Sequence, residues 1–487
     1  EGPGDGWSGA TTNHGADLWY SMITMDDFVL NDGVGTRPTP LNTFSYPVRI
    51  TDNEACKADG TETKLYCQPL CDQFGTGTAL DSDGTVREFC QTGDVDMLTG
   101  EQMVLNGDTG ASRPVIKLLR TNASTAEYVV VLGYEETKGM SENQTSETNI
   151  ELEGKSVYFE TFPFKKIVSP TNEDEFKTLL SSLPMVSSGN IINVKAPEVV
   201  VNDDNTTTAT GDMIYENARR LTFIPQIDPC DSGKYTYGWL YKQGIFTQGG
   251  SSDMYVRFNN NFDATLTDPV NVSANADDNT TDHLTDNSYD DMNENSFSPR
   301  GFMRGDDIYI GFEYTPDYHP DSGYSPNNFY IRRYTNDAWQ PAQNISLVAG
   351  NNLSTLDPRF VTTPSSKYNL TGGVIESDKS NPNVLFMAYG TFDIVTGIEQ
   401  DLYYTRSTDK GVTWETVGTS GVTPNANLAI KQDIEEKEVQ SLATPDGTRL
   451  FNAWLQESVE QPNVLDLNDH FLGLDTWFGV VNYNILK

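Results

Sequence analysis

The sequence is short of basic residues, and this shortage excludes whole classes of partner. It has 32 Lys and Arg against 70 Asp and Glu, so the formal net charge of the 487 residues is −38 at pH 7. Such a field repels other polyanions, which excludes nucleic acid as a partner and electrostatic docking on anionic lipid. The sequence also lacks an apolar run of about 18 residues or more, so we expect no membrane-spanning helix.

Histidines are also scarce. The four that occur, His14, His283, His319 and His470, stand far apart in segments that read as loops. A copper or haem site needs several His or Met ligands brought together. No P-loop, dinucleotide-binding or G-x-S-x-G motif is apparent either. The sequence therefore gives no signal for haem, nucleotide or flavin.

Only five cysteines are present. Four of them lie close together, at Cys56, Cys67, Cys71 and Cys90, and the fifth is Cys230. The four lack the paired C-x-x-C spacing of zinc sites. We expect two disulfides that tie a surface loop in an oxidising compartment, with the pairing left open. The expected location is therefore extracellular or the cell surface, with the periplasm as the alternative.

Aromatic residues, in contrast, make up 11% of the sequence, which is enough for a real core. A small residue followed by an aromatic closes a short apolar strand five times, and a second aromatic strand follows each pair. The pairs are Gly133-Tyr134, Gly238-Trp239, Gly311-Phe312, Ala388-Tyr389 and Ala453-Trp454. The second strands are residues 157–159, 254–256, 329–331, 402–404 and 476–478. Two recurring central strands per repeat are typical of propeller blades.

The repeats predict an all-β protein, a single β-propeller over residues 1–487. A sixth copy of the second strand stands alone at residues 18–20, so we expect six blades, with five or seven as alternatives. Residues 51–110 are expected to form a Cys-rich loop insertion within the propeller, tied by disulfides. Residues 275–297 are expected to form an acidic loop.

One repeat carries a more specific motif. Residues 407–414 read S-T-D-K-G-V-T-W, which is the S-x-D-x-G-x-x-W Asp-box of sialidase-type propellers. In such a turn the Asp accepts backbone N–H bonds, the Gly takes a positive φ and the Trp packs between sheets. We therefore assign structural roles, and not catalytic ones, to Ser407, Asp409, Gly411 and Trp414.

Several phrases of the sequence resemble those of a known family. They are residues 215–220, 298–306, 310–316, 381–384 and 444–447. Over roughly residues 110–460 the chain resembles the bacterial surface proteins called choice-of-anchor O, which are built on a BNR/Asp-box, sialidase-like propeller. The resemblance implies export and a C-terminal sorting segment. No such segment precedes Lys487, and the chain opens at Glu1 without a signal peptide. We therefore expect a trimmed chain whose anchor was removed, or a released member.

A sialidase reaction would need three Arg to clamp a carboxylate, a Tyr–Glu pair and an Asp acid/base. Candidate arginines are Arg257, Arg304, Arg332, Arg359 and Arg406. Arg257 and Arg332 occupy the same place in the repeat, which favours a structural role. The nearest match to the N-terminal Arg motif of sialidases, around Arg49, is weak. We assign no catalytic residues.

Carboxylates are the one abundant type of metal ligand. Asp81, Asp83 and Glu88 place carboxylates beside a Gly turn, as calcium-binding loops do, and Asp94 and Asp96 repeat the alternation. We therefore expect an exported propeller, stabilised by calcium, that serves as a binding or structural protein in a matrix, assembly or adhesion. Its partner would be a glycan or another surface protein. The alternatives are a sialidase-like glycoside hydrolase or lyase, and an accessory protein of a periplasmic or surface metal or redox system.

Overall fold

The computed structural model describes about twenty segments of the chain, and all of them consist of strands, turns and bends. The described residues are 18–21, 48–50, 76–80, 86–95, 102–104, 109–120, 128–138, 155–164, 190–201, 207–215, 217–227, 233–244, 252–262, 265–273, 295–315, 326–348, 352–364, 380–395, 399–429, 436–457 and 474–483. These segments contain no helix, and hence none long and apolar enough to cross a membrane. The all-β class predicted from the sequence is confirmed.

The chain divides into two compact units. Unit 1 comprises Glu1–Ala196, Met213–Leu221 and Phe262–Thr265, and unit 2 comprises Pro197–Asp212, Thr222–Asn261 and Leu266–Lys487. The prediction of a single propeller over residues 1–487 stays a prediction.

Unit 1 is built around a four-stranded antiparallel sheet. Its strands are β6 (Thr109–Arg120), β7 (Tyr128–Lys138), β8 (Lys155–Pro163) and β9 (Asn190–Ile191), in that order. A pair of short strands, β1 (Trp19–Tyr20) and β2 (Val48–Arg49), contributes Tyr20 to the core on one face of this sheet, against Val130, Leu132 and Phe162. The solitary strand predicted at residues 18–20 therefore has a partner, and Arg49 lies opposite Trp19.

The predicted Cys-rich insertion contains regular structure. A three-stranded sheet is formed by β3 (Thr76–Leu80), β4 (Val86–Val95) and β5 (Gln102–Val104).

Two further strands, β10 (Lys195–Val201) and β11 (Thr207–Tyr215), pair with each other. The predicted acidic loop at 275–297 lies outside the described residues except for its last three, which belong to a strand.

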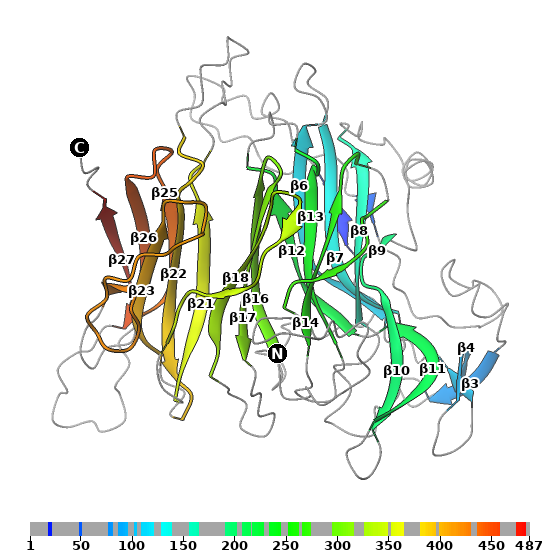
Figure 1. Ribbon diagram of the computed structural model, residues 1–487. Coiled ribbons are helices and arrows are strands. Elements are labelled where there is room, and N and C mark those ends of the chain that lie inside the picture. Colours follow the sequence, from blue (N-terminus) through cyan, green and yellow to red (C-terminus); the bar gives the residue numbers. More distant parts are fainter. Residues whose placement is uncertain are drawn as a thin grey trace, which may run out of the picture. The chain divides into compact units, whose positions relative to one another are not determined.

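Four antiparallel sheets follow one another along the rest of the chain, from green to red in Figure 1. The first holds β12 (Asn217–Pro225), β13 (Tyr237–Gly244), β14 (Asp253–Asn259) and β15 (Val270–Asn271). The second holds β16 (Asn295–Arg304), β17 (Asp307–Thr315), β18 (Asn328–Thr335), β19 (Ala338–Trp339) and β20 (Gln343–Asn344). The third holds β21 (Leu353–Thr362), β22 (Leu385–Asp393), β23 (Glu399–Ser407) and β24 (Ala426–Ala429). The last holds β25 (Glu436–Ala443), β26 (Arg449–Glu457) and β27 (Leu474–Asn482).

The middle sheets of unit 2 are buried on both faces. On β17, Ile308, Ile310 and Phe312 pack with the residues of β13 and β14, whereas Tyr309 packs with Phe360 and Tyr389 of the following sheet. Side chains alternate between the faces of a strand, so a strand buried on both faces needs apolar residues at nearly every position. This explains why β17 is buried along almost its whole length.

The strand pairs predicted from the repeat are confirmed by the register. Tyr134 lies opposite Tyr158, Phe312 opposite Tyr330, Tyr389 opposite Tyr403 and Trp454 opposite Trp477. In the sheet of β12–β15, Gly238 lies opposite Phe258, so the predicted strand 254–256 extends further along the same pairing. A Cβ on Gly238 would lie 2.7 Å from the ring of Phe258. The small residue therefore makes room for an aromatic ring of its own sheet.

Candidate functional site

The first strand of several sheets contains a β-bulge at the same place. The register shifts between Ser112 and Val115 in β6, between Phe297 and Arg300 in β16, between Leu356 and Arg359 in β21, and between Lys437 and Gln440 in β25. At each bulge one residue other than glycine has a positive φ. These residues are Arg113 (50°), Ser298 (47°), Asp357 (48°) and Glu438 (53°). Bulges of this kind redirect side chains and are common beside functional sites.

The bulges also explain the prolines that follow in three of the strands, Pro114, Pro299 and Pro358. A proline cannot donate to a sheet ladder, so inside a sheet it is tolerated at a bulge. The next residue in β16 and in β21 is an arginine, Arg300 and Arg359. We call Arg300, Asp357, Arg359 and Gln440 the bulge cluster.

The bulge cluster links three successive sheets of unit 2. Arg359 Nη2 donates to Asp357 Oδ2 at 2.6 Å, and Arg359 Nη1 also donates to the same carboxylate. Arg300 donates through Nη2 to Asp357 at 3.3 Å and through Nε to the carbonyl of Pro358 at 2.8 Å. Arg359 Nε donates to Gln440 Oε1 at 3.2 Å. Two guanidinium groups thus share one carboxylate.

The cluster is partly open to solvent. The exposed fractions of the side chains are 28% for Arg300, 30% for Asp357 and 18% for Arg359. It offers several N–H donors and a carboxylate acceptor on a rigid strand framework. Such a surface can bind a ligand rich in hydroxyl groups, since polar groups fixed on regular elements set a ligand's orientation.

A buried acid lies behind the cluster. Ser298 Oγ donates to Glu313 Oε2, and Glu313 is only 5% exposed. Burial raises the pKa of Glu313 to about 7, against the lowering effect of hydrogen bonds from Ser298 and Thr355 and of the charge of Arg300. The pKa is therefore suited to proton transfer, but the carboxyl is shielded from any ligand in solution.

Glu135 of unit 1 occupies the matching place in its repeat, directly after Gly133-Tyr134. Its Oε1 accepts the backbone N–H of Arg220 at 2.7 Å, and Arg113 lies 3.8 Å away. Both arginines have a positive φ. The carboxyl groups at this place in the repeat therefore hold strained first-strand residues.

The five arginines proposed from the sequence do not share one site. They lie in three sheets and are held by different partners, and Arg359 alone belongs to the bulge cluster. Arg257 donates to Thr267 O at 2.8 Å, Arg304 to Thr363 Oγ1 at 3.0 Å, Arg332 to Asn271 O at 2.9 Å and Arg406 to Glu415 Oε1 at 3.0 Å. Arg257 and Arg332, which share a place in the repeat, each donate to backbone carbonyls.

The motif at residues 407–414 forms one compact turn after β23. Asp409 accepts from the Thr413 N–H at 2.9 Å and from the Ser407 hydroxyl at 2.8 Å, and Gly411 has a φ of 79°. Burial would raise the pKa of Asp409, but the hydrogen bonds from Thr413 and Ser407 outweigh it and lower the pKa. Trp414 packs against the core shared by the two middle sheets. These contacts tie strands together and leave the carboxylate occupied.

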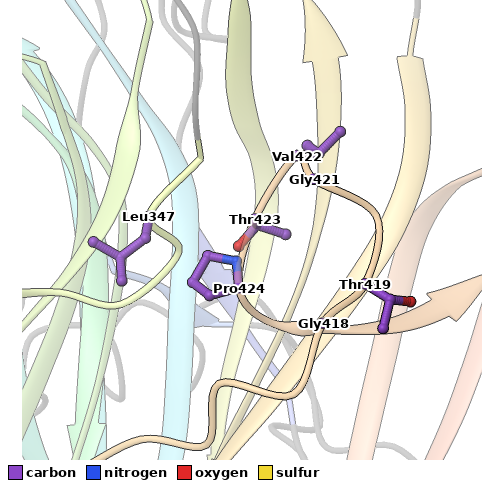
Figure 2. A pocket seen from close by; sticks show the side chains of 7 residues that line it. All are labelled: Leu347, Gly418, Thr419, Gly421, Val422, Thr423 and Pro424. Carbon is purple, nitrogen blue, oxygen red and sulfur yellow. The ribbon is translucent and has the colours of Figure 1, made fainter.

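An open hollow of about 390 Å³ lies between the ends of the two middle sheets. Figure 2 shows Leu347 on one side of it and Pro424 and Thr423 on the other. The remaining lining residues are Gly418, Thr419, Gly421 and Val422, so the lining is uncharged. Leu347 has a φ of 45° and its side chain is 46% exposed.

The floor of this hollow is a buried hydrogen-bond network. Tyr389 Oη donates to Thr423 Oγ1 at 2.9 Å, and Asn425 Nδ2 donates to Tyr389 Oη at 3.0 Å. Asn425 also donates to the carbonyl of Ile345 at 3.0 Å, and Thr423 donates to that of Ser346. The network fixes the hollow's wall because it joins the two middle sheets through groups that water cannot reach.

The predicted disulfide and calcium residues lie mostly outside the described residues. This holds for Cys56, Cys67, Cys71, Asp81, Asp83 and Asp96. The backbones of Glu88, Cys90 and Asp94 belong to β4. In the described part of the chain no group of three or more His, Cys, Asp or Glu residues is placed to hold a metal ion.

Comparisons with known proteins find remote likeness only. No protein-family model matches the chain, and no curated protein matches it. Among solved structures, the chain is similar to a protein of unknown function from Dyadobacter fermentans, with 10% identity, coverage of 72% of this chain and 76% of that one, and a TM-score of 0.33. It is also similar to an ulvan lyase, a polysaccharide lyase bound to -[GlcA(1-4)Rha3S]- (9% identity, 75% and 68% covered, TM-score 0.34). A third similar structure is a glycoside hydrolase, with 9% identity, coverage of 88% of this chain and 98% of that one, and a TM-score of 0.29. At these TM-scores the likeness carries no argument about function.

Proposed function

We propose that the protein is an exported β-propeller of the choice-of-anchor O type that acts as a binding or assembly module at the cell surface, without catalysis. The observation that supports this proposal is the use of its arginines. Four of the five candidates are held by separate partners, and Arg359 is paired with Asp357 of its own strand. A substrate carboxylate would have to displace Asp357 from a fork that already matches it.

The buried acids support the same conclusion. Glu313 is 5% exposed, and so is Glu160 of unit 1, whose pKa is raised to about 8 by burial and by the charge of Glu136. A general acid must come within hydrogen-bond reach of its substrate. Glu313 and Glu160 have pKa values that suit a general acid, but a substrate in solution cannot reach their carboxyl groups.

The ligand that best suits the bulge cluster is a glycan. Its partly exposed guanidinium groups and carboxylate offer donors and acceptors to the hydroxyl groups of a glycan. The strongly acidic remainder of the chain disfavours polyanions. We therefore expect neutral or zwitterionic glycans to bind better than sulfated ones.

A glycan array tests this proposal, with a turnover assay on every glycan that binds. We expect the double variant Asp357→Ala with Arg359→Ala to lose binding at least about tenfold. The matched control is Arg257→Ala, since Arg257 lies in a sheet outside the cluster. Turnover of a bound glycan by the wild type would contradict the non-catalytic role and favour the hydrolase or lyase.

Calcium stabilisation is a separate proposal, supported by the alternating carboxylates at Asp81, Asp83 and Glu88 and at Asp94 and Asp96. Elemental analysis of native protein and melting before and after EDTA test it. We expect whole-number calcium and a lower melting temperature after chelation. An unchanged melting curve in EDTA, with no calcium bound, would rule it out. Mass spectrometry without reductant would show the two proposed disulfides among the clustered cysteines.

A further inference from the structure

The outer edges of the sheets differ in length. The sheets of β6–β9, β12–β15, β16–β20 and β21–β24 end in outer strands of only 2 to 4 residues. The last sheet ends in β27, which has 9 residues. Natural proteins keep their edge strands short or charged, because a long apolar edge is a template for pairing with another strand.

Within the described residues, β27 has little of the usual protection of an edge. Its sequence, LDTWFGVVN, contains one charged residue, Asp475, and neither Pro nor Lys. Trp477, Phe478 and Val480 are 46%, 66% and 36% exposed. In the part of the chain that the structure describes, β27 pairs with β26 and with no strand on its other side.

The face of the last sheet is apolar and exposed as well. Leu442, Phe451 and Val480 lie opposite one another across its three strands, and Leu442 is 74% exposed. Phe451 and Phe478 stack with their ring centroids 6.1 Å apart. The other face, with Leu450 and Trp454, packs against β22 and β23. Among the described residues, the last sheet therefore has one packed face, one exposed face and an unpaired edge strand.

We propose that β27 pairs with β27 of a second copy of this chain, antiparallel and about a two-fold axis at Phe478. This register pairs all nine residues. It places Asp475 opposite Val481 and Phe478 opposite its own copy, so no like charges face each other, which would be destabilising. A chain with a net charge of −38 repels its copies elsewhere. The nearly uncharged strand β27 is a described surface at which this repulsion is small.

The inference goes beyond the proposed function and does not depend on it. Pairing at β27 leaves the bulge cluster unchanged, so glycan binding and self-association can fail separately.

The experiment measures molar mass by light scattering over a range of protein concentrations, at about 0.1 M and about 1 M NaCl. We expect dimers whose dissociation constant falls as salt rises. The screening length shortens from about 10 Å to about 3 Å, which weakens the repulsion and leaves the strand pairing intact. An interface held by ion pairs would respond to salt in the opposite way.

Two variants test the register. Phe478→Lys and Phe478→Glu each place like charges opposite each other on the axis, and we expect each to raise the dissociation constant about tenfold or more. An equimolar mixture of the two should form mixed dimers again. The matched controls are Val395→Lys and Val395→Glu, since Val395 is 73% exposed and lies outside the last sheet. Melting curves confirm that each variant is folded.

Three results would overturn the proposal. A wild type that stays monomeric at every concentration and salt would show that the edge takes a different strand or none. Dimers that both Phe478 variants leave unchanged would place the interface elsewhere. A mixture that fails to recover dimers would rule out this register.

Discussion

The middle sheets of unit 2, β16–β20 and β21–β24, differ from the last sheet, β25–β27, in how they are completed. All three have the first-strand bulge and a small residue followed by an aromatic. In the middle sheets both faces are buried and the outer strands are short. In the last sheet Phe478 is 66% exposed, and the Nε1 of Trp454 has no hydrogen-bond partner in the described part of the chain.

The difference shows what completes such a sheet. Tyr389 and Trp454 occupy the same place in the repeat, opposite the bulge. Tyr389 is 0% exposed, and its hydroxyl lies in the network with Thr423 and Asn425, which belong to the segment before β24. The last sheet has no described counterpart of that segment. In the described residues, the buried hydrogen-bond network and the short outer strand therefore occur in the same sheet, and the sheet described without them has an unpaired edge strand.

The largest expected difference is in the loss of stability caused by truncating one aromatic residue in each kind of sheet, Tyr389 and Phe478. Tyr389→Ala removes a fully buried ring and its hydrogen bonds with Thr423 and Asn425, so we expect it to lower the free energy of unfolding by about 4 kcal/mol. Phe478→Ala should cost less than about 1 kcal/mol, because that ring is mostly exposed. Urea unfolding of dilute protein measures both. Equal losses would mean that the last sheet is covered in the monomer, and the proposed difference between the middle sheets and the last sheet would be wrong.

The second effect is a pH dependence confined to a middle sheet. The pKa of Glu313 is raised from 4.5 to about 7 by burial, so the folded state holds a proton that the unfolded state releases. This contribution to stability is complete below pH 4.5 and is lost as the pH rises to about 7. The total loss is about 3 kcal/mol.

The variant Glu313→Gln isolates this contribution. It keeps an acceptor for Ser298 and cannot ionise, so the stability of the variant relative to wild type should rise between pH 4.5 and 7. Glu438→Gln, at the exposed bulge of the last sheet, is the control and should follow the wild-type profile. Parallel profiles for wild type and Glu313→Gln would show that the carboxyl is not buried as described.

The third effect compares two turns with similar hydrogen bonds. Asp409 accepts from Thr413 and Ser407 and is backed by the packed Trp414, whereas Asp446 of the last sheet accepts from Thr444 and Thr448 in an exposed hairpin. We expect Asp409→Ala to cost about 1 to 2 kcal/mol and Asp446→Ala about half as much.

Lowering the pH should remove the stability that the carboxylates of Asp409 and Asp446 contribute in both turns. Hydrogen bonds lower both pKa values, although burial acts in the opposite direction and is the largest single influence on Asp409. Each carboxylate therefore stabilises the fold above the ordinary pKa of Asp, and this stabilisation is lost as the pH falls. Thermal melts at pH 7 and pH 3 measure the loss. A variant Asp409→Ala as acid-sensitive as wild type would contradict this origin.

The fold was predictable to the level of strands because strand signals are local. The pairs from Gly133-Tyr134 to Ala453-Trp454 mark second strands, and the aromatic runs after them mark third strands, and the structure pairs these strands with each other. The outer strands were not predictable, since two residues such as Val270–Asn271 carry no periodicity. The pairing of β1 with β2 joins residues far apart in sequence and leaves no local signal either.

The bulge cluster was missed for a physical reason. A positive φ is expected at glycine, but here it falls on Ser298, Asp357 and Glu438, where tertiary contacts impose it. A signal was present: Ser298-Pro299-Arg300 and Asp357-Pro358-Arg359 place the same Pro-Arg pair in the strand that precedes the repeat's small residue and aromatic. Proline in a strand indicates a bulge. That Arg300 reaches the next sheet could not follow from the sequence alone.

The smallest effect concerns the links that the bulge cluster makes between sheets. A double-mutant cycle on Arg300 and Asp357, which joins the two middle sheets, should give a coupling energy of about 0.5 to 1 kcal/mol, because both side chains are partly exposed. The cycle on Arg359 and Gln440, which joins the middle to the last sheet, should give less than about 0.5 kcal/mol, because the glutamine is neutral and exposed. Only the first coupling should fall when salt is raised to about 1 M. A larger coupling for the second pair would mean that the last sheet is held as firmly as the middle ones, and its open edge would then need another explanation.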